Sequence, residues 1–275
     1  MHTTTNLNSA HWKSTLGEPG WPWKRSVCSR SSCRCSCWLN GGSCLANVYF
    51  AIDTSESVAM ARFPWGSLVS KLIDFLSLFV ERLEQSSQLP RKIQWAYGGL
   101  HFSSHVEVFS PIVQNPSPFL ARARAIRYIG KGTFIDCALR NVTEQVRLRS
   151  PVRPVLQYAV VLTDGHMTGS PCGGVQEAAE AAKAAGIKIF VVATNQETVE
   201  GELRLIASSP AAKYRKDYQA FPSAQQQEAV NRITSAMVSV VGPGKCRVTV
   251  TRLSTAIFYF TILYSRGEKV RLLTV

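Results

Sequence analysis

Apolar residues are distributed along the chain in two patterns, which separate a long regular middle from two irregular ends. Between residues 46 and 241, short apolar runs alternate with segments whose apolar residues recur every three or four positions. Runs of the first kind are typical of strands buried on both faces, and segments of the second kind are typical of amphipathic helices. We therefore expect strands and helices to alternate along this part of the chain.

Three apolar runs predict buried strands, at residues 47–52, 158–163 and 187–193. Two alternating segments, at residues 93–97 and 106–108, predict two further strands, with a tight connection at Gly98-Gly99. Helical stripes predict helices at about residues 64–85, 119–126, 135–146, 175–185, 198–207 and 223–241. We expect Gly186 just after the end of one helix, and a capping box formed by Ser223 and Gln226 at the start of the last.

This order of elements predicts an α/β fold with a doubly wound, mostly parallel sheet, one antiparallel edge strand and helices on both faces. We place the domain at residues 45–245. Residues 1–44 have no period and are expected to be disordered or irregular; the alternative is a small zinc knuckle at Cys33, Cys35 and Cys37, although zinc sites usually have wider spacing. Residues 246–275 contain two β-rich segments around a turn and predict an irregular or hairpin tail.

Acidic and hydroxyl side chains follow the predicted parallel strands where each strand ends. A D-x-S-x-S motif, Asp53, Ser55 and Ser57, follows the first strand, Asp164 follows another, and Thr133 precedes a helix. Because parallel sheets bind ligands at the carboxyl ends of their strands, we expect these groups to converge. They offer only oxygen atoms, which favours Mg²⁺, with Mn²⁺ or Ca²⁺ as alternatives. The competing interpretation is that both aspartates only satisfy loop backbone.

We expect this site to bind a partner and to perform no catalysis, because no positioned base or nucleophile accompanies the oxygen ligands. The phosphate-binding loop of nucleotide hydrolases, the nucleophile elbow of serine hydrolases and the zinc-protease helix motif do not occur in the sequence. His101 and His105 are expected to be surface histidines, whereas His166 stands beside the site and is a candidate for tuning partner binding.

Several segments resemble the von Willebrand factor A domain with its metal-ion-dependent adhesion site, and in particular the N-terminal A domain of type VI collagen chains. They are residues 48–57, 97–103, 106–111, 132–139 and 163–174. The resemblance spans about residues 44–246, and the sequence departs from it at Ile135, where many A domains have a second threonine. It implies a protein-binding module of the extracellular matrix, active in cell adhesion and matrix organisation. The implied partners are matrix or cell-surface proteins that offer an acidic side chain, and other collagen chains.

The net charge of +13 does not by itself indicate nucleic-acid binding. Residues 1–44 and 247–275 each carry a net charge of +4, whereas nucleic-acid readers usually concentrate basic residues on one face of a folded domain. A basic stretch in the middle, Arg122, Arg124, Arg127 and Lys131, is expected to be the solvated face of a helix. We therefore expect no nucleic-acid partner, and keep nucleic-acid binding as a lesser alternative. No apolar run is long enough to predict a membrane span.

The cysteines and one sequon favour a secreted protein. Cys137 and Cys172 lie shortly after Thr133 and Asp164, on loops expected at the metal face, and predict a disulfide; two buried thiols are the alternative. A second bridge, Cys44–Cys246, would close the domain, with the cysteines of the first tail as competitors. Asn141 begins an N-x-T sequon for glycosylation. Residues 1–40 lack the apolar segment of a signal peptide, which keeps an intracellular A-domain scaffold as the alternative.

Overall fold

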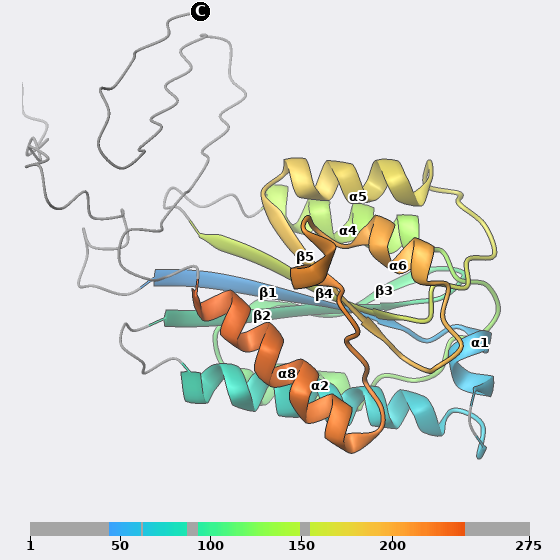
Figure 1. Cartoon of the computed structure of the whole chain (residues 1–275), viewed down its shortest axis with the longest axis horizontal. Helices are drawn as coiled ribbons and strands as arrows, with labels where there is room; N and C mark the ends of the chain where they lie inside the picture. The colour runs from blue at the N-terminus through green and yellow to red at the C-terminus, as the bar shows by residue number, and fades with distance from the viewer. Residues whose placement is uncertain (1–43, 62, 87–92, 149–154, 240–275) are drawn as a thin grey trace, which may run out of the picture. The chain divides into compact units, whose positions relative to one another are not determined.

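The computed structural model describes residues 44–61, 63–86, 93–148 and 155–239, and these contain a five-stranded sheet (Figure 1). The strand order is β3-β2-β1-β4-β5; β3 pairs antiparallel with β2, and all other pairs are parallel. This confirms the predicted fold class, with its single antiparallel edge strand. The strands are β1 Cys44–Asp53, β2 Ile93–Phe102, β3 Val106–Val113, β4 Leu156–Thr163 and β5 Ile187–Ala193.

Helices cover both faces of the sheet, with α4, α5 and α6 on one side and α2 and α8 on the other (Figure 1). Both faces of β1 are buried, and the ring of Phe50 packs 5.5 Å from Phe79 and 5.8 Å from Phe119. The helices are α1 Glu56–Met60, α2 Ser67–Ser86, α3 Pro116–Arg124, α4 Ile135–Leu148, α5 Val175–Ala184, α6 Glu200–Ile206, α7 Ala211–Tyr214 and α8 Ser223–Val238.

The ends of two helices test the predicted capping. Gly186 follows the C-cap of α5 with φ +85°, the left-handed conformation that glycine adopts at little cost, as expected. The capping box at Ser223 is wrong. The N-cap of α8 is Pro222, whose carbonyl accepts a bond from the backbone N of Gln226 at 3.0 Å, and Ser223 already lies inside the first turn.

The predicted connection at Gly98-Gly99 is also wrong, because β2 continues through both glycines to Phe102. The turn comes later, where the N–H of Ser103 donates to the carbonyl of His105 at 3.0 Å. The ring of Phe109 on β3 lies directly over Gly99, so that an added Cβ there would come within 2.1 Å of the ring. The glycine is therefore required by packing across the β2–β3 pair and does not mark a chain reversal.

Part of the predicted organisation falls on residues that are not described. The first tail up to residue 43, with its cysteine cluster, and the predicted hairpin of residues 246–275 lie outside the described residues. The domain boundaries at 45 and 245 therefore remain predictions. Within the described ranges, no helix is long and apolar enough to cross a bilayer.

Replacing Gly99 by alanine should destabilise the domain by about 1–3 kcal/mol, the usual range for overpacking a filled core. The matched control is Gly201→Ala at an exposed position of α6, where an added Cβ meets nothing within 4 Å. That variant should gain about 0.5–1 kcal/mol from helix propensity. Urea unfolding of both variants measures the difference, and an unchanged midpoint for Gly99→Ala would contradict the packing described here.

Candidate metal centre

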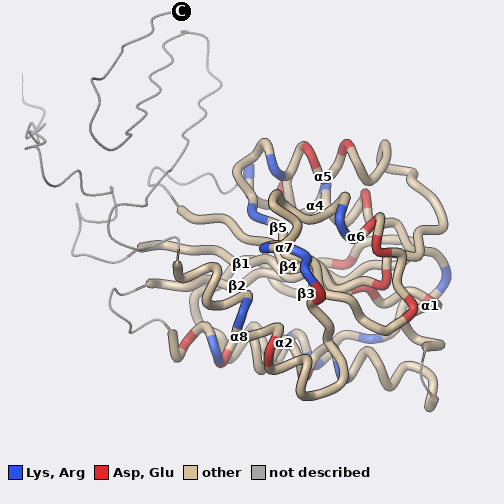
Figure 2. Tube along the Cα trace, viewed as in Figure 1, with Lys and Arg blue, Asp and Glu red and all other residues tan. Residues whose placement is uncertain are grey.

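The structure places the predicted metal ligands at one edge of the sheet, where β1 and β4 end side by side. Asp53 is the last residue of β1, and Asp164 directly follows the parallel neighbour β4. Ser55 and Ser57 lie at the start of α1, with their hydroxyl oxygens 3.1 Å apart. Thr133 is buried in the loop before α4. Figure 2 shows acidic positions gathered near this end of the sheet.

Two backbone hydrogen bonds fasten the Thr133 loop to the D-x-S-x-S segment. The N–H of Glu56 donates to the carbonyl of Lys131, and the N–H of Gly130 donates to the carbonyl of Thr54, both at 3.2 Å. Lys131 has φ +65°, which is uncommon for a residue other than glycine and directs its carbonyl into this contact. The loop is therefore held beside α1 by the main chain, independently of any ligand.

Both carboxylates are fully buried and are held by neutral donors. One oxygen of Asp53 accepts the N–H of Ser55 at 2.9 Å, and the other accepts the hydroxyl of Thr163 at 2.6 Å. Asp164 accepts the N–H of His166 at 3.0 Å and the side-chain amide of Asn195 at 3.4 Å. In the described part of the chain, neither aspartate has a lysine or arginine as an ion-pair partner.

Burial, with the nearby charge of Asp164 as the second cause, raises the pKa of Asp53 to about 7. Two buried like charges without a compensating cation are unfavourable, and a bound divalent cation would remove the conflict. The donor atoms at hand are carboxylate and hydroxyl oxygens, which fit Mg²⁺, Mn²⁺ or Ca²⁺ better than a soft metal. The arrangement could therefore hold a cation.

Sequence reasoning missed two supports of the carboxylates, Thr163 and Asn195. Thr163 is the last residue of β4, and Asn195 lies two residues beyond the end of β5, the next parallel strand. The strand-end rule that selected Asp53 and Asp164 would have selected both positions. They orient the carboxylate oxygens and contribute polar groups from two neighbouring strands.

On the other side of the site, a disulfide joins Cys137 and Cys172, with their Cα atoms 5.1 Å apart. The buried carboxylate of Asp136 accepts backbone N–H groups from Cys137 at 2.9 Å, Cys172 at 2.7 Å and Gly174 at 3.2 Å. The hydroxyl oxygen of Thr168 accepts the N–H of Thr133 at 2.8 Å. The loop after β4 is therefore tied to the Thr133 loop. Asp136 was missed because nothing in its spacing distinguishes it from an ordinary helix residue.

The two sulfurs lie close to Asp136, in an arrangement of ligand-type atoms that resembles a metal cluster. Because the sulfurs are bonded to each other, they are not available as thiolate ligands, and this cluster only holds the two loops together.

Two other predicted modification sites lie on α4 and β1. Asn141 is half-buried on α4, and its side-chain oxygen accepts a hydrogen bond from the side-chain amide of Gln145 at 2.7 Å. Cys44 is buried at the start of β1, and its proposed partner Cys246 lies outside the described residues.

The histidines differ in their environments, and the surface interpretation is wrong for His101. His101 is only 4% exposed, because it lies on β2, with its Nδ1 3.2 Å from the hydroxyl of Thr54 and its Nε2 3.3 Å from Glu107. His105 is exposed, as expected, and its Nε2 contacts the same carboxylate at 3.0 Å. His166 is exposed beside Asp164, with its Nε2 3.1 Å from the carbonyl of Glu197.

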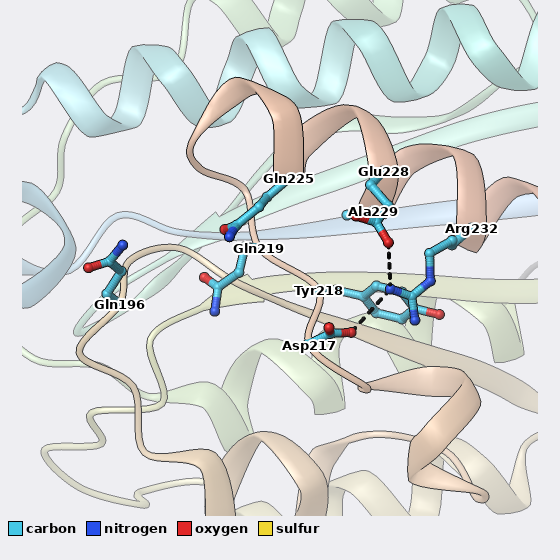
Figure 3. Close-up of a pocket in the computed structure, with 8 residues that line it drawn as sticks. All are labelled: Gln196, Asp217, Tyr218, Gln219, Gln225, Glu228, Ala229 and Arg232. Atoms are coloured by element: carbon cyan, nitrogen blue, oxygen red, sulfur yellow. Dashed lines mark hydrogen bonds and ion pairs between the residues drawn. The ribbon is translucent and has the colours of Figure 1, made fainter.

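A separate polar hollow of about 310 Å³ lies between α8 and the segments that follow β5 and α7 (Figure 3). On one side, Arg232 contacts Asp217 and Glu228, each at 3.2 Å. On the other side are three glutamine carboxamides, those of Gln196, Gln219 and Gln225. The two carboxylates are already paired with a guanidinium and largely exposed, which makes this hollow a poorer cation site than the buried pair at β1 and β4.

Comparison with known proteins places this site in a family. The model of the von Willebrand factor type A domain matches residues 47–232, which include all five predicted ligands. The chain belongs to the von Willebrand factor type A domain family. Among its relatives, the collagen α2(VI) chain of Gallus gallus is 44% identical over 198 residues, covering 70% of this chain and 19% of the relative.

Two further relatives extend the comparison. The collagen α1(VI) chain of Homo sapiens is 33% identical over 205 residues, covering 72% of this chain and 20% of the relative. Matrilin-1 of Gallus gallus is 32% identical over 184 residues, covering 66% of this chain and 34% of the relative. The chain thus spans about a fifth of the type VI collagen chains and a third of matrilin-1.

Solved structures share the fold at low sequence identity. Proximal thread matrix protein 1 of the mussel byssus aligns with a TM-score of 0.58 and 18% identity, covering 71% of this chain and 49% of that one. A second structure of that protein is described as having a zinc-occupied MIDAS (metal-ion-dependent adhesion site) motif. It aligns with a TM-score of 0.56 and 18% identity, covering 71% of this chain and 48% of that one. At this identity the likeness establishes the fold alone.

Replacing Asp136 by asparagine should destabilise the domain by about 2 kcal/mol, because a buried charged group that accepts three backbone N–H groups is lost. Asp74→Asn is the control, since Asp74 is exposed on α2 and makes only a 3.9 Å contact with Lys71. Its effect should stay within about 0.5 kcal/mol. Thermal unfolding of the disulfide-intact variants measures both values; equal effects would contradict the structural role of Asp136.

The raised pKa of Asp53 predicts how stability depends on pH in the metal-free protein. The folded state keeps the Asp53 proton up to about pH 7, whereas the unfolded chain releases it near the ordinary value of 3.8. The free energy of unfolding should therefore fall as the pH rises through this window, and stabilisation by Mg²⁺ should grow over the same range.

Melting temperatures of the wild type and Asp53→Asn, in EDTA and in Mg²⁺ at about pH 5 and about pH 8, test this linkage. The Mg²⁺-induced increase should be large only for the wild type at the higher pH. An equal increase at both pH values, or in both proteins, would contradict it.

Proposed function

We propose that the chain is a non-catalytic protein-binding module whose contact with its partner depends on a metal ion. The proposal is carried by the fully buried pair Asp53 and Asp164, which share one sheet edge with hydroxyls and have no cationic side chain as an ion-pair partner within the described residues. Asp53, Ser55, Ser57, Thr133 and Asp164 would hold the ion, Mg²⁺ being the best fit to all-oxygen ligands. The zinc-occupied MIDAS motif of the mussel protein supports a metal in this fold.

The bound ion would supply a Lewis-acidic position that accepts one carboxylate from a partner protein. The protein's own residues orient and insulate that position. Thr163 and Asn195 fix the outer oxygens of the aspartates, and the backbone bonds of Glu56 and Gly130 hold the surrounding loops in place. A partner aspartate or glutamate would therefore meet a prearranged site, with little loop ordering left to oppose binding.

We place this module in the extracellular matrix, in cell adhesion and matrix organisation. The collagen VI and matrilin-1 relatives support that setting, and the disulfide Cys137–Cys172 fits an oxidising compartment. The Asn141 sequon is proposed to carry a glycan, and a bridge from Cys44 to Cys246 is proposed to close the domain. The partners would be matrix or cell-surface proteins, including other collagen chains.

Binding of the full chain to immobilised type VI collagen and matrilin-1 tests this proposal. Binding should require Mg²⁺, disappear in EDTA, and fall at least tenfold in Asp164→Ala and in Thr133→Ala. Asp217→Ala, which alters an exposed carboxylate outside the site, is the matched control and should bind as the wild type does. Binding that persists in EDTA and in both site variants would overturn the metal-dependent contact.

A further inference from the structure

An apolar groove opens beside the candidate metal centre. It has a volume of about 310 Å³ and is lined by Ala59, Met60, Trp65, Gly66 and Tyr128. Three large side chains of this groove are exposed to solvent: Met60 by 51%, Trp65 by 61% and Tyr128 by 46%. Trp, Tyr and Met are the residue types enriched in the buried centres of protein interfaces, and clustered exposure of this kind marks an interaction surface.

The groove and the metal centre are built from the same two segments. Met60 lies on α1 three residues after Ser57, which is about one helical turn. Tyr128 lies on the loop that leads to Thr133, and its ring folds back against Gly130, where φ is +81° and an added Cβ would come within 2.8 Å of the phenol oxygen. The backbone bond from Glu56 to Lys131 joins the two segments. A partner bound at the metal would therefore lie next to the groove.

Three basic residues lie close in sequence to the groove residue Tyr128. Arg124 at the end of α3, and Arg127 and Lys131 on the loop, are exposed, and none has an ion-pair partner within the described ranges. Of the four residues expected on one basic helix face, Arg122 and Arg124 lie on α3, whereas Arg127 and Lys131 lie on the loop that follows it, which corrects that expectation. Glu56 is the one acidic side chain on these two segments among the described residues. The excess of basic residues on the segment from Arg124 to Lys131 favours an acidic partner, and the groove complements an apolar side chain.

We propose that the partner of the metal centre is a peptide segment in which an acidic residue is followed or preceded closely by a bulky apolar residue. The acidic side chain faces the metal, and the apolar side chain fills the groove between Met60, Trp65 and Tyr128. This inference rests on the proposed function, because it uses the same contact between a partner carboxylate and the bound metal. It adds a second contact, in the groove, that would select among acidic partners.

Synthetic peptides test the pairing directly. They carry one glutamate and one 4-fluorophenylalanine on a Gly/Ser background, at separations of about one to four residues, which match the reach of an extended chain across a turn of helix. Reference peptides carry the glutamate alone or the fluorophenylalanine alone. Binding to the full disulfide-bonded chain is followed by titration calorimetry and by ¹⁹F line broadening, which detects weak complexes, in Mg²⁺ and in EDTA.

For at least one separation, the peptide with both residues should bind about tenfold to a hundredfold more tightly than the peptide with glutamate alone. This is the gain in affinity expected from burying one aromatic side chain. Trp65→Ser and Tyr128→Ser should remove this gain and leave binding of the glutamate peptide unchanged. Leu148→Ser, at the exposed end of α4, is the matched control and should keep the full gain, since Leu148 is 76% exposed and does not line the groove.

The outcomes separate the groove from the metal site. Mg²⁺-dependent binding of the glutamate peptide without any gain from the aromatic residue overturns the groove and leaves the proposed function standing. If the gain persists in EDTA, the groove binds the aromatic residue without the metal, which overturns the metal-dependent contact and its pairing with the groove. No binding of any peptide overturns both the groove and the metal site. Light scattering of the same variants gives one further outcome: a dimer that Trp65→Ser dissociates would assign the groove to a second copy of the chain and contradict the proposal.

Discussion

Asp53 and Asp164 place two carboxylates at 0% exposure at the ends of adjacent parallel strands, and this constraint organises the rest of the site. Burying like charges side by side is costly, and the neutral donors around them, Thr163, Asn195 and two backbone N–H groups, offset only part of that cost. The rise of the Asp53 pKa to about 7 shows that ionising this buried carboxyl beside Asp164 remains unfavourable. A bound divalent cation would relieve this unfavourable interaction, which is the physical reason for proposing metal binding at this end of the sheet.

The two sides of this site are stabilised in different ways. On the α4 side, the disulfide, the Asp136 carboxylate and Thr168 fix the loop after β4 against the start of α4. On the α1 side, the walls are exposed apolar side chains between backbone-anchored segments. A binding surface of this kind could orient one charged group of a partner on its rigid side. Its apolar side could select the partner's neighbouring residues by shape.

The sheet and six of the eight helices in the described part of the chain follow from sequence periodicity, because β1, β4 and β5 are buried on both faces and these helices carry apolar stripes. The common location of the candidate metal ligands could be predicted, because each stands where a parallel strand or a loop beside it reaches the same end of the sheet. The same rule extends to Asn195, which was not selected because the search was confined to carboxylate and hydroxyl side chains.

Other features depend on packing between elements that are distant in sequence. Gly98-Gly99 resembles a turn locally, and only the ring of Phe109 from β3 explains why β2 continues through it. His101 is polar in sequence and buried in the structure, because Thr54, the residue after β1, and Glu107 on β3 contact its two nitrogens. The role of Asp136 likewise depends on a loop 36 residues away. Such pairings are not encoded in any local period.

Anomalous diffraction from crystals of the chain grown with Mn²⁺ tests the central claim most directly. The account predicts one strong peak between the oxygens of Ser55, Ser57, Thr133 and the two aspartates, with protein ligands and waters at roughly 2.0–2.3 Å, as expected for a small oxygen-bound divalent cation. A peak at the exposed Asp217–Glu228 pair instead, or buried aspartates that remain without manganese at saturating concentration, would contradict it.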